Sequence, residues 1–358
     1  MVIRLYKISA CLAFAVFGLL LADRAACAAA APEQTIKVVG GLATGNRYAR
    51  IERPFWTTDL AKASGGRFAA EVVPFDRAGV PGQDLLRLMQ IGVIPFGTVL
   101  FSHLAADVPE LYAPDLAGLN PDLSELQNNL AAFKDFLERT LRERYGLELL
   151  SVYVYPAQVL FCRQAFTRLA DVAGRRVRVA SASAADFVNG LGGTPVITEF
   201  SEIMTYVRGG NVDCAVTGAL SGNTIGLHEP MRFISAQPIS WGLSVFVANG
   251  AAWRAMHPDF RSLLQTALPK LEQDIWRQAQ HDSAEGLDCN RGLATCATGK
   301  KGSMVLVAPA GDDAIRRTQV LRSHVLPAWL RRCGTRCEDV WQQTVAKSSG
   351  ISLAKRAP

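Results

Sequence analysis

The chain has 358 residues, of which 49% are hydrophobic and 20% charged, and its formal net charge at pH 7 is +6. This mild positive excess contains no lysine- or arginine-rich run interleaved with aromatic residues, which excludes a nucleic-acid-binding protein of the usual basic type. The length exceeds that of one small core and predicts two lobes.

The first residues are typical of a secretory signal peptide. Arg4 and Lys7 precede an apolar run over 8–22 that is too short for a convincing membrane span, and small residues follow at 26–30. We expect residues 1–30 to be removed and the mature protein to act in the periplasm. The removed segment holds three basic residues and one acidic residue, so the mature charge would be +4.

Cys27 leaves open that the protein is a lipoprotein, because lipoproteins are acylated on a cysteine at the end of the signal segment. Arg24 stands three residues before it, where a lipoprotein signal has an aliphatic residue, so simple cleavage is the favoured interpretation. No later stretch of the sequence is apolar enough to span a bilayer.

Six cysteines would remain after processing, and an even number in an oxidising compartment permits disulfides. They are Cys162, Cys214, Cys289, Cys296, Cys333 and Cys337. The last four form two close pairs in loop-like sequence, and each pair is predicted to close its own short loop. The first two lie far apart in apolar, strand-like runs and are predicted to be buried free thiols. The spacings do not match a zinc finger and no histidine lies near either close pair, so we predict no metal or other cofactor.

Strands alternate with helices along the first part of the chain, which predicts an α/β fold with largely parallel sheets. In chain order we expect a strand at 36–39, a helix at 47–63, a strand at 68–74, a helix at 83–91 and a strand at 97–101. The same order returns at 176–180, 184–191, 195–200, 202–208 and 212–217. Two such blocks predict two lobes of similar build that face each other across a cleft.

Longer elements connect and follow these blocks. They are a helix at 123–145, strands at 147–155 and 243–248, a helix at 258–285, a strand at 302–308 and a helix at 312–330. We assign 31–155 to lobe I and 156–248 to lobe II. Residues 249–345 return to lobe I, with a long bracing helix and the C-terminal helix. The repeated crossing predicts a hinge, and the polar tail after Gly350 is predicted to be disordered.

The sequence carries none of the common enzyme signatures. The five histidines are scattered, and none forms a His-Glu-x-x-His pair. Residues 218–222 do not fit the frame of a serine nucleophile elbow, and the glycine-rich segment 40–45 lacks both phosphate-loop registers. We therefore predict no catalytic residue and a protein that is not an enzyme.

Arg178 is the main candidate ligand-binding residue. In 176–180 arginines alternate with valines, which places Arg178 near the carboxyl end of a strand, where open α/β sheets bind ligands. A guanidinium there can hold a carboxylate through two parallel hydrogen bonds. Most arginines are merely solvated, and the same pattern leaves open that Arg176 is the inward one. Arg163, which ends another apolar run, is a second candidate that needs a ligand or an acidic partner.

Further candidates lie near other predicted strand ends. Neutral hydrogen-bonding groups and aromatic side chains there could orient and enclose an anion, although turn and core roles are the commoner ones. These candidates are Thr217, Ser221, Asn223, Trp241, Phe75 and Tyr155.

Two segments resemble the extracytoplasmic solute-binding subunits of TRAP transporters, the DctP-type family. Residues 169–179 are similar to the family's Asp-x-x-Gly-x-x-x-Arg-Val segment, and 200–213 are similar to its helix-to-strand segment. The resemblance implies a type II periplasmic-binding-protein-like fold with two α/β lobes, a hinge and a bracing helix. It implies that Arg178 clamps the carboxylate of the solute, and it places Arg163 near a second arginine that some members use.

The chain also departs from this family pattern. Thr217 stands near a position where the family commonly has asparagine, and the cysteine-bearing segments are unlike those of many members, so the chain resembles a divergent branch. We predict a monomeric receptor that delivers a small organic acid to TRAP membrane permease subunits. The alternatives are an ABC-type or tricarboxylate-type binding protein, a periplasmic enzyme acting on an organic acid, and a sensor.

Overall fold

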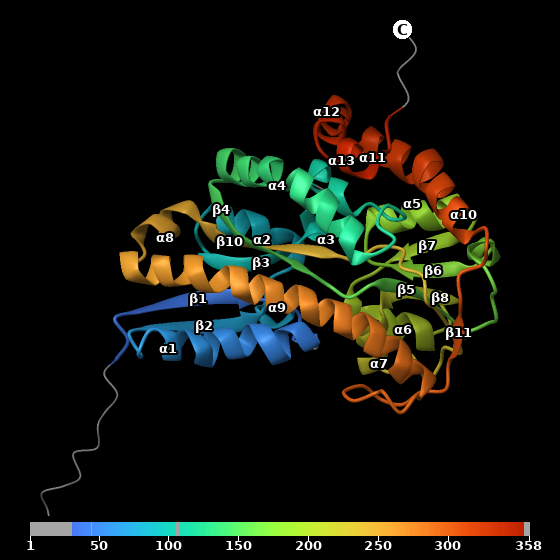
Figure 1. Ribbon diagram of the computed structural model, residues 1–358, viewed down its shortest axis with the longest axis horizontal. Helices are drawn as coiled ribbons and strands as arrows, with labels where there is room; N and C mark the ends of the chain where they lie inside the picture. The colour runs from blue at the N-terminus through green and yellow to red at the C-terminus, as the bar shows by residue number, and fades with distance from the viewer. Residues whose placement is uncertain (1–30, 44, 105–106, 354–358) are drawn as a thin grey trace, which may run out of the picture.

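The computed structural model describes residues 31–43, 45–104 and 107–353 (Figure 1). The predicted signal peptide, Cys27 and the last five residues of the tail lie outside the described residues. Within the described ranges, no helix combines the length and apolar character that a membrane span requires.

Five strands form a first sheet, called sheet A, in the order β2-β1-β3-β10-β4. Their bounds are β1 Gln34–Gly40, β2 Phe68–Pro74, β3 Phe96–Leu100, β4 Leu147–Val154 and β10 Leu243–Asn249. Strand β1 is parallel to β2 and β3, whereas β10 is antiparallel to both of its neighbours. The apolar run of β10 suits this central place, because a strand covered on both faces needs hydrophobic residues throughout.

Six strands form a second sheet, called sheet B, in the order β11-β9-β5-β8-β6-β7. Their bounds are β5 Gln158–Cys162, β6 Arg176–Val179, β7 Thr194–Ile197, β8 Cys214–Gly218, β9 Phe233–Ser235 and β11 Val305–Val307. Strand β6 is parallel to β7 and β8, and β5 is antiparallel to β8 and β9. The mixed α/β architecture and the two sheets confirm the predicted fold class.

The pairing of two strands differs from the lobe boundaries that the sequence predicts. Strand β10 falls in the segment 156–248, yet it pairs with β3 and β4 in sheet A. Strand β11 falls in the returning segment 249–345, yet it pairs with β9 in sheet B. A hydrophobic pattern reveals that a segment is a strand but not which partner it will pair with, so the sequence did not show to which sheet β10 and β11 belong.

Thirteen α-helices are present among the described residues. They are α1 Leu60–Ala63, α2 Leu85–Gln90, α3 Phe101–Leu104, α4 Leu123–Tyr145, α5 Ala182–Gly190, α6 Ile203–Arg208, α7 Ala219–Thr224, α8 Gly250–Ala255, α9 Pro258–Arg291, α10 Asp313–Val320, α11 Leu326–Cys333, α12 Thr335–Gln343 and α13 Val345–Ser349. The predicted helix 47–63 is observed as two π-helical turns, Tyr48–Glu52 and Phe55–Asp59, followed by α1. A seven-residue 3₁₀ helix, η5 Pro109–Asp115, precedes α4.

Helix α9 braces the two sheets, and Figure 1 shows it running from beside β1 and β2 to α7. Its apolar residues Leu264, Leu268 and Leu271 recur at helical spacing and pack in the core of sheet A. Further along, a Cβ atom at Gly286 would collide with the backbone of α7. Glycine at this position therefore permits the close approach that ties α9 to the side of sheet B.

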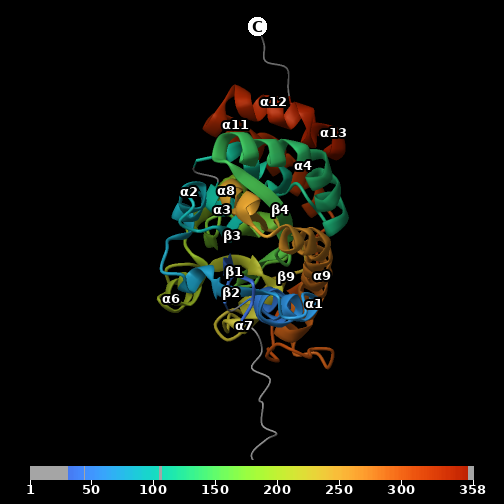
Figure 2. The same ribbon diagram turned by 90° about the vertical axis from the view of Figure 1, so that its left-hand side faces the viewer.

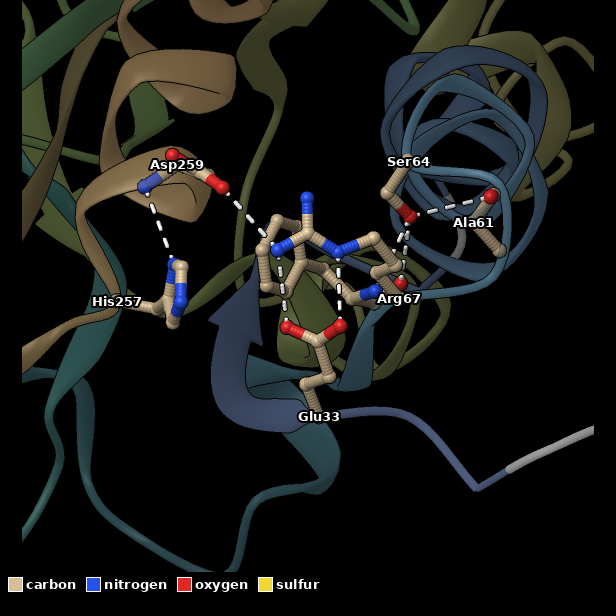
Figure 3. A network of polar contacts seen from close by, with 7 residues as sticks. Glu33, Ala61, Ser64, Arg67, His257 and Asp259 are labelled. Atoms are coloured by element: carbon tan, nitrogen blue, oxygen red, sulfur yellow. Dashed lines mark hydrogen bonds and ion pairs between the residues drawn. The ribbon is translucent and has the colours of Figure 1, made fainter.

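A surface network fixes the start of α9 to sheet A (Figure 3). The Arg67 guanidinium donates to both oxygens of Glu33, at 2.8 and 3.0 Å, and to Asp259 at 3.1 Å. All three side chains are exposed, so these ion pairs help to position the start of α9 but contribute little to stability.

Three disulfides are present among the described residues. Cys289–Cys296 and Cys333–Cys337 close short loops as predicted. The prediction of free thiols at Cys162 and Cys214 is wrong, because these two residues form the third disulfide, with 4.1 Å between their Cα atoms. They face each other in the antiparallel pairing of β5 with β8, so strand register brings together two cysteines that are 52 residues apart in sequence.

The C-terminal helices cover one flank of the molecule. Figure 2 shows α11, α12 and α13 lying over α4. The indole nitrogen of Trp329 donates to the carbonyl of Pro109 at 2.7 Å, which ties α11 to η5. The sequence predicts a helix only to 330, so α12 and α13 were not expected.

Candidate ligand-binding site

A cavity of about 550 Å³ lies between the two sheets, within the range of small-molecule sites. Sheet A and the elements that follow its strands contribute Leu42, Phe75, Asp76, Leu100, Ser102, His103, Tyr155 and Leu243. Sheet B and its loops contribute Gln158, Arg178, Ser181, Thr198, Glu199, Thr217, Gly218 and Ser221. Many of these residues lie at or just after the carboxyl ends of parallel strands, where open α/β sheets bind their ligands.

Arg178 projects from β6 into this cavity and is 1% exposed. Its Nε donates to the Thr198 hydroxyl at 3.2 Å, Nη1 to the Val216 carbonyl at 3.1 Å and Nη2 to the Thr198 carbonyl at 2.5 Å. Burial lowers the pKa of Arg178 to about 10, so the guanidinium still carries its charge at neutral pH.

No carboxylate within the described ranges lies close enough to Arg178 to form an ion pair at 4.0 Å. The carboxylates of Glu199 and Glu202 act on the guanidinium only from further away, where they raise its pKa against the larger effect of burial. A buried charge that has neutral acceptors alone is costly unless a counter-ion arrives. The geometry of β6 therefore leaves a cation ready to receive an anion.

The structure brings four other predicted residues to the same cavity. Thr217 and Ser221 are contributed by the end of β8 and by α7, and Phe75 and Tyr155 by the ends of β2 and β4. Hydroxyl and aromatic groups thus line the same cavity as the cation.

Three predicted residues do not line the cavity. Arg163 donates to the Val207 carbonyl at 2.7 Å, and Trp241 donates from its indole nitrogen to the Asn120 carbonyl at 3.3 Å. Asn223 holds the loop after the Cys289–Cys296 disulfide, because it exchanges hydrogen bonds with the backbone of Lys300 at 2.7 and 2.8 Å.

The direction of β5 explains the position of Arg163. Strand β5 runs antiparallel to β8, so its first residue, Gln158, pairs with Gly218 at the cavity. Its last residue, Cys162, pairs with the first residue of β8, at the far end of the strand. Arg163 therefore follows β5 at the end of the sheet away from the cavity.

Sequence reasoning missed a polar pair in the cavity, His103 and Glu199. The Nε2 atom of His103 lies 3.7 Å from a carboxylate oxygen of Glu199, and the two residues belong to opposite sides of the cavity. Glu199 follows β7 as Ser181 follows β6, so the strand-end rule could have found it. His103 is a lone histidine after β3, and no pattern in the sequence singles it out.

A second buried arginine stands behind Tyr155. Arg47 donates to the Tyr155 hydroxyl at 2.9 Å and to Ser244 at 3.1 Å, and it lies over the Tyr155 ring at 4.2 Å. Its Nε is 3.8 Å from Glu52, which is fully buried and accepts from the Gly41 amide at 3.0 Å. Burial raises the pKa of Glu52, and Arg47 counteracts this effect. The pair holds Tyr155 in place as part of the wall.

Asp115, at the end of η5, ties down the segment between β9 and β10. It accepts hydrogen bonds from the Trp241 amide at 3.2 Å and the Gly242 amide at 2.7 Å. Burial raises the pKa of Asp115 to about 7 against these hydrogen bonds. The adjacent crossover from β4 to β5 is held through the Tyr155 amide, which donates to the Gly242 carbonyl at 2.9 Å. Asp115 therefore secures the junction where the chain passes between the sheets.

One cluster of potential metal ligands is found among the described residues, on α9. The ligand atoms of His281, Asp282 and Glu285 lie within 4.8 Å of one another. Asp282 already accepts from Gln278 at 2.7 Å, and Glu285 accepts from the backbone of the 297–298 loop. The cluster does not line the cavity.

Residues 51–288 match the model of the DctP family, described as bacterial extracellular solute-binding protein, family 7. The chain belongs to this family. The predicted resemblance is thereby confirmed over about two thirds of the sequence.

Solved structures of TRAP solute receptors share the fold. The chain resembles DctP7 of Bordetella pertussis, a receptor binding pyroglutamic acid, with a TM-score of 0.76 and 18% identity over 89% of this chain and 100% of that one. A Rhodoferax ferrireducens protein with bound malonate gives a TM-score of 0.76 and 17% identity over 88% and 98%. A Desulfovibrio salexigens protein with bound orotic acid gives a TM-score of 0.76 and 12% identity over 88% of this chain and 98% of that one. The fold is thus that of type II periplasmic binding proteins, as predicted.

Proposed function

We propose that the protein is the periplasmic solute receptor of a TRAP transporter and that it captures a small organic acid between its two sheets. Arg178 binds the carboxylate, and the receptor delivers the acid to the membrane permease subunits. The family, the fold and the position of the cavity all support this role. The structural relatives named above bind pyroglutamic acid, malonate and orotic acid, each of which is an acid of the proposed size class.

One observation carries the proposal: Arg178 is buried and charged at the wall of a cavity, and none of the described residues gives it a carboxylate partner. Three of its nitrogens donate to neutral protein acceptors, which orients the guanidinium. Each Nη atom retains a second N–H, and two N–H groups side by side match the two oxygens of a carboxylate. A bound carboxylate would supply the missing negative charge.

The remaining walls suit an enclosed anion. Thr217 and Ser221 offer hydroxyl donors, while Phe75 and Tyr155 provide an apolar enclosure that strengthens polar contacts inside it. Ligand contacts to both sheets would favour a closed arrangement over an open one, by as much as the ligand binds the closed form more tightly. The permease would then recognise the closed form.

A thermal-shift screen of the mature protein against small organic acids tests this function. A ligand at a thousand times its dissociation constant stabilises the folded state by about 4 kcal/mol. We expect at least one acid to raise Tm in the wild type, and Arg178→Ala to abolish the shift while the protein remains folded by circular dichroism. Arg178→Lys keeps the charge but loses the paired donors, so it should bind with intermediate affinity.

Arg176→Ala is the matched control, because Arg176 lies on the same strand but is exposed and paired with Asp213 at 2.9 Å. This variant should bind as the wild type does. Nuclear magnetic resonance of the bound acid over several hours tests for turnover, and none is expected. A wild type that no acid stabilises would contradict the proposal, and so would an Arg178→Ala variant that binds normally.

A further inference from the structure

The described residues that line the cavity carry more carboxylates than arginine or lysine side chains. Among the described lining residues, Arg178 is the only arginine or lysine. Two carboxylates, Asp76 and Glu199, and one imidazole, His103, also line the cavity. The site therefore offers one full cation for a ligand carboxylate, together with acceptors for something else.

Glu199 lies beside the place where a carboxylate would bind. It directly follows Thr198, whose hydroxyl and carbonyl both accept from Arg178. Its charge is the largest electrostatic influence on the guanidinium. The distance nevertheless exceeds that of an ion pair, so Glu199 does not occupy the free N–H groups of Arg178.

Glu199 is ionised and open to a ligand. The imidazole of His103, 3.7 Å away, is the main cause that lowers the pKa of Glu199. Its side chain is 63% exposed, whereas that of His103 is 9% exposed. A carboxylate has acceptor sites on both oxygens and Glu199 lines the cavity, so one neighbouring imidazole leaves it acceptor capacity for a ligand.

This arrangement is unfavourable for a second carboxylate on the ligand. A dicarboxylate bound to Arg178 would bring its other charge into a cavity whose described lining holds two carboxylates and no further arginine or lysine. Like charges placed together in a partly desolvated site oppose binding. A hydroxyl, amide or ammonium group close to the bound carboxylate would instead donate to Glu199.

We propose that the cavity selects monocarboxylates that carry a hydrogen-bond donor next to the carboxylate, with Arg178 binding the carboxylate and Glu199 accepting from the donor. The inference rests on the proposed receptor function and narrows its substrate class. It names Glu199 as the residue that discriminates against dicarboxylates.

Isothermal titration calorimetry with matched acids tests this selection. At each chain length from three to six carbons, the panel contains the 2-hydroxy and 2-amino monocarboxylates, the unsubstituted monocarboxylate and the dicarboxylate. We expect the donor-bearing monocarboxylates to bind at least roughly ten-fold more tightly than the dicarboxylate of equal length, because of the like-charge contact. They should also bind more tightly than the unsubstituted acid.

Two isosteric variants test whether Glu199 causes the preference for monocarboxylates over dicarboxylates. Glu199→Gln removes the charge at the cavity and should reduce the preference for a monocarboxylate over a dicarboxylate at least several-fold. Glu202→Gln removes an equal charge that also acts on Arg178 but does not line the cavity, so it should leave the preference unchanged. Unfolding curves confirm that both variants remain folded.

The outcomes separate the inference from the function on which it rests. A wild type that binds a dicarboxylate as tightly as the matched 2-hydroxy acid overturns the inference while the receptor function stands. Equal effects of the two variants would also overturn it, because Glu199 would then act only through bulk charge. A protein that binds no acid of any class, with Arg178→Ala indistinguishable from the wild type, overturns the receptor function itself.

Discussion

Each side of the cavity holds a buried arginine, and the two arginines differ in their partners. On the side of sheet A, Arg47 lies 3.8 Å from the buried carboxylate of Glu52 and is further held by Tyr155 and Ser244. On the side of sheet B, the partners of Arg178 within the described part of the chain are a hydroxyl and two carbonyl groups. Both arginines are almost fully buried, yet only one has its charge balanced by a nearby carboxylate.

The difference separates a structural arginine from the one that we propose to bind a ligand. Arg47 carries its own counter-ion and uses its remaining donors to fix Tyr155, so its role is complete within the fold. Arg178 is rigidly oriented but unbalanced, a state that an incoming anion improves. The strand that carries Arg178, β6, is also next to a cross-linked strand: β8 is joined to β5 by the Cys162–Cys214 disulfide.

Removing the counter-ion on the side of sheet A should have the largest effect on stability. Glu52→Ala leaves Arg47 buried without a counter-ion, and breaking such a pair typically costs about 3–5 kcal/mol. Urea unfolding monitored by circular dichroism measures the loss. The double variant Arg47→Met with Glu52→Leu removes both charges and should cost clearly less; an equal or larger cost would show that the charge balance does not matter.

Opening the disulfide of sheet B should have the next largest effect. Replacing both Cys162 and Cys214 by alanine removes a cross-link over 52 residues, and such cross-links contribute about 2–4 kcal/mol. Chemical denaturation measures the change. Replacing Cys333 and Cys337, whose loop spans only 4 residues, should cost less, and the reverse order would contradict the argument from loop closure.

The junction between the sheets should make stability depend on pH. The pKa of Asp115 is raised to about 7 in the folded state, so between about pH 4 and 7 the native protein retains a proton that the unfolded chain has released. Its contribution to stability therefore falls as pH rises through this window, by at most about 1.4 kcal/mol per pH unit. Asp115→Asn should remove this part of the slope in unfolding curves recorded across the window; an unchanged slope would contradict the assignment.

The smallest effect is expected at Arg163. Its guanidinium donates to the Val207 carbonyl and does not reach the cavity. Arg163→Ala should therefore leave the affinity for the acid found in the thermal-shift screen nearly unchanged, in contrast to Arg178→Ala. A loss of affinity comparable to that of Arg178→Ala would show that the site extends beyond the cavity described above.

The sequence by itself determined the local elements and the position of Arg178 near the end of its strand. Helix α4 has the predicted bounds because Asp122 caps its start and Gly146, with φ of 64°, ends it. Strand β2, Phe68–Pro74, also has its predicted bounds. Arg178 was predictable because strand alternation and the position of ligands in α/β sheets are both local rules.

Only the tertiary structure decided which distant segments meet. It placed β10 in sheet A, joined Cys162 to Cys214, turned Arg163 away from the cavity and brought His103 to Glu199. Each of these outcomes depends on strand order, direction and register between segments far apart in the chain. The hydrophobic period of a segment is the same whichever partner it pairs with. The sequence pattern therefore predicts the strands but not which strands lie next to each other.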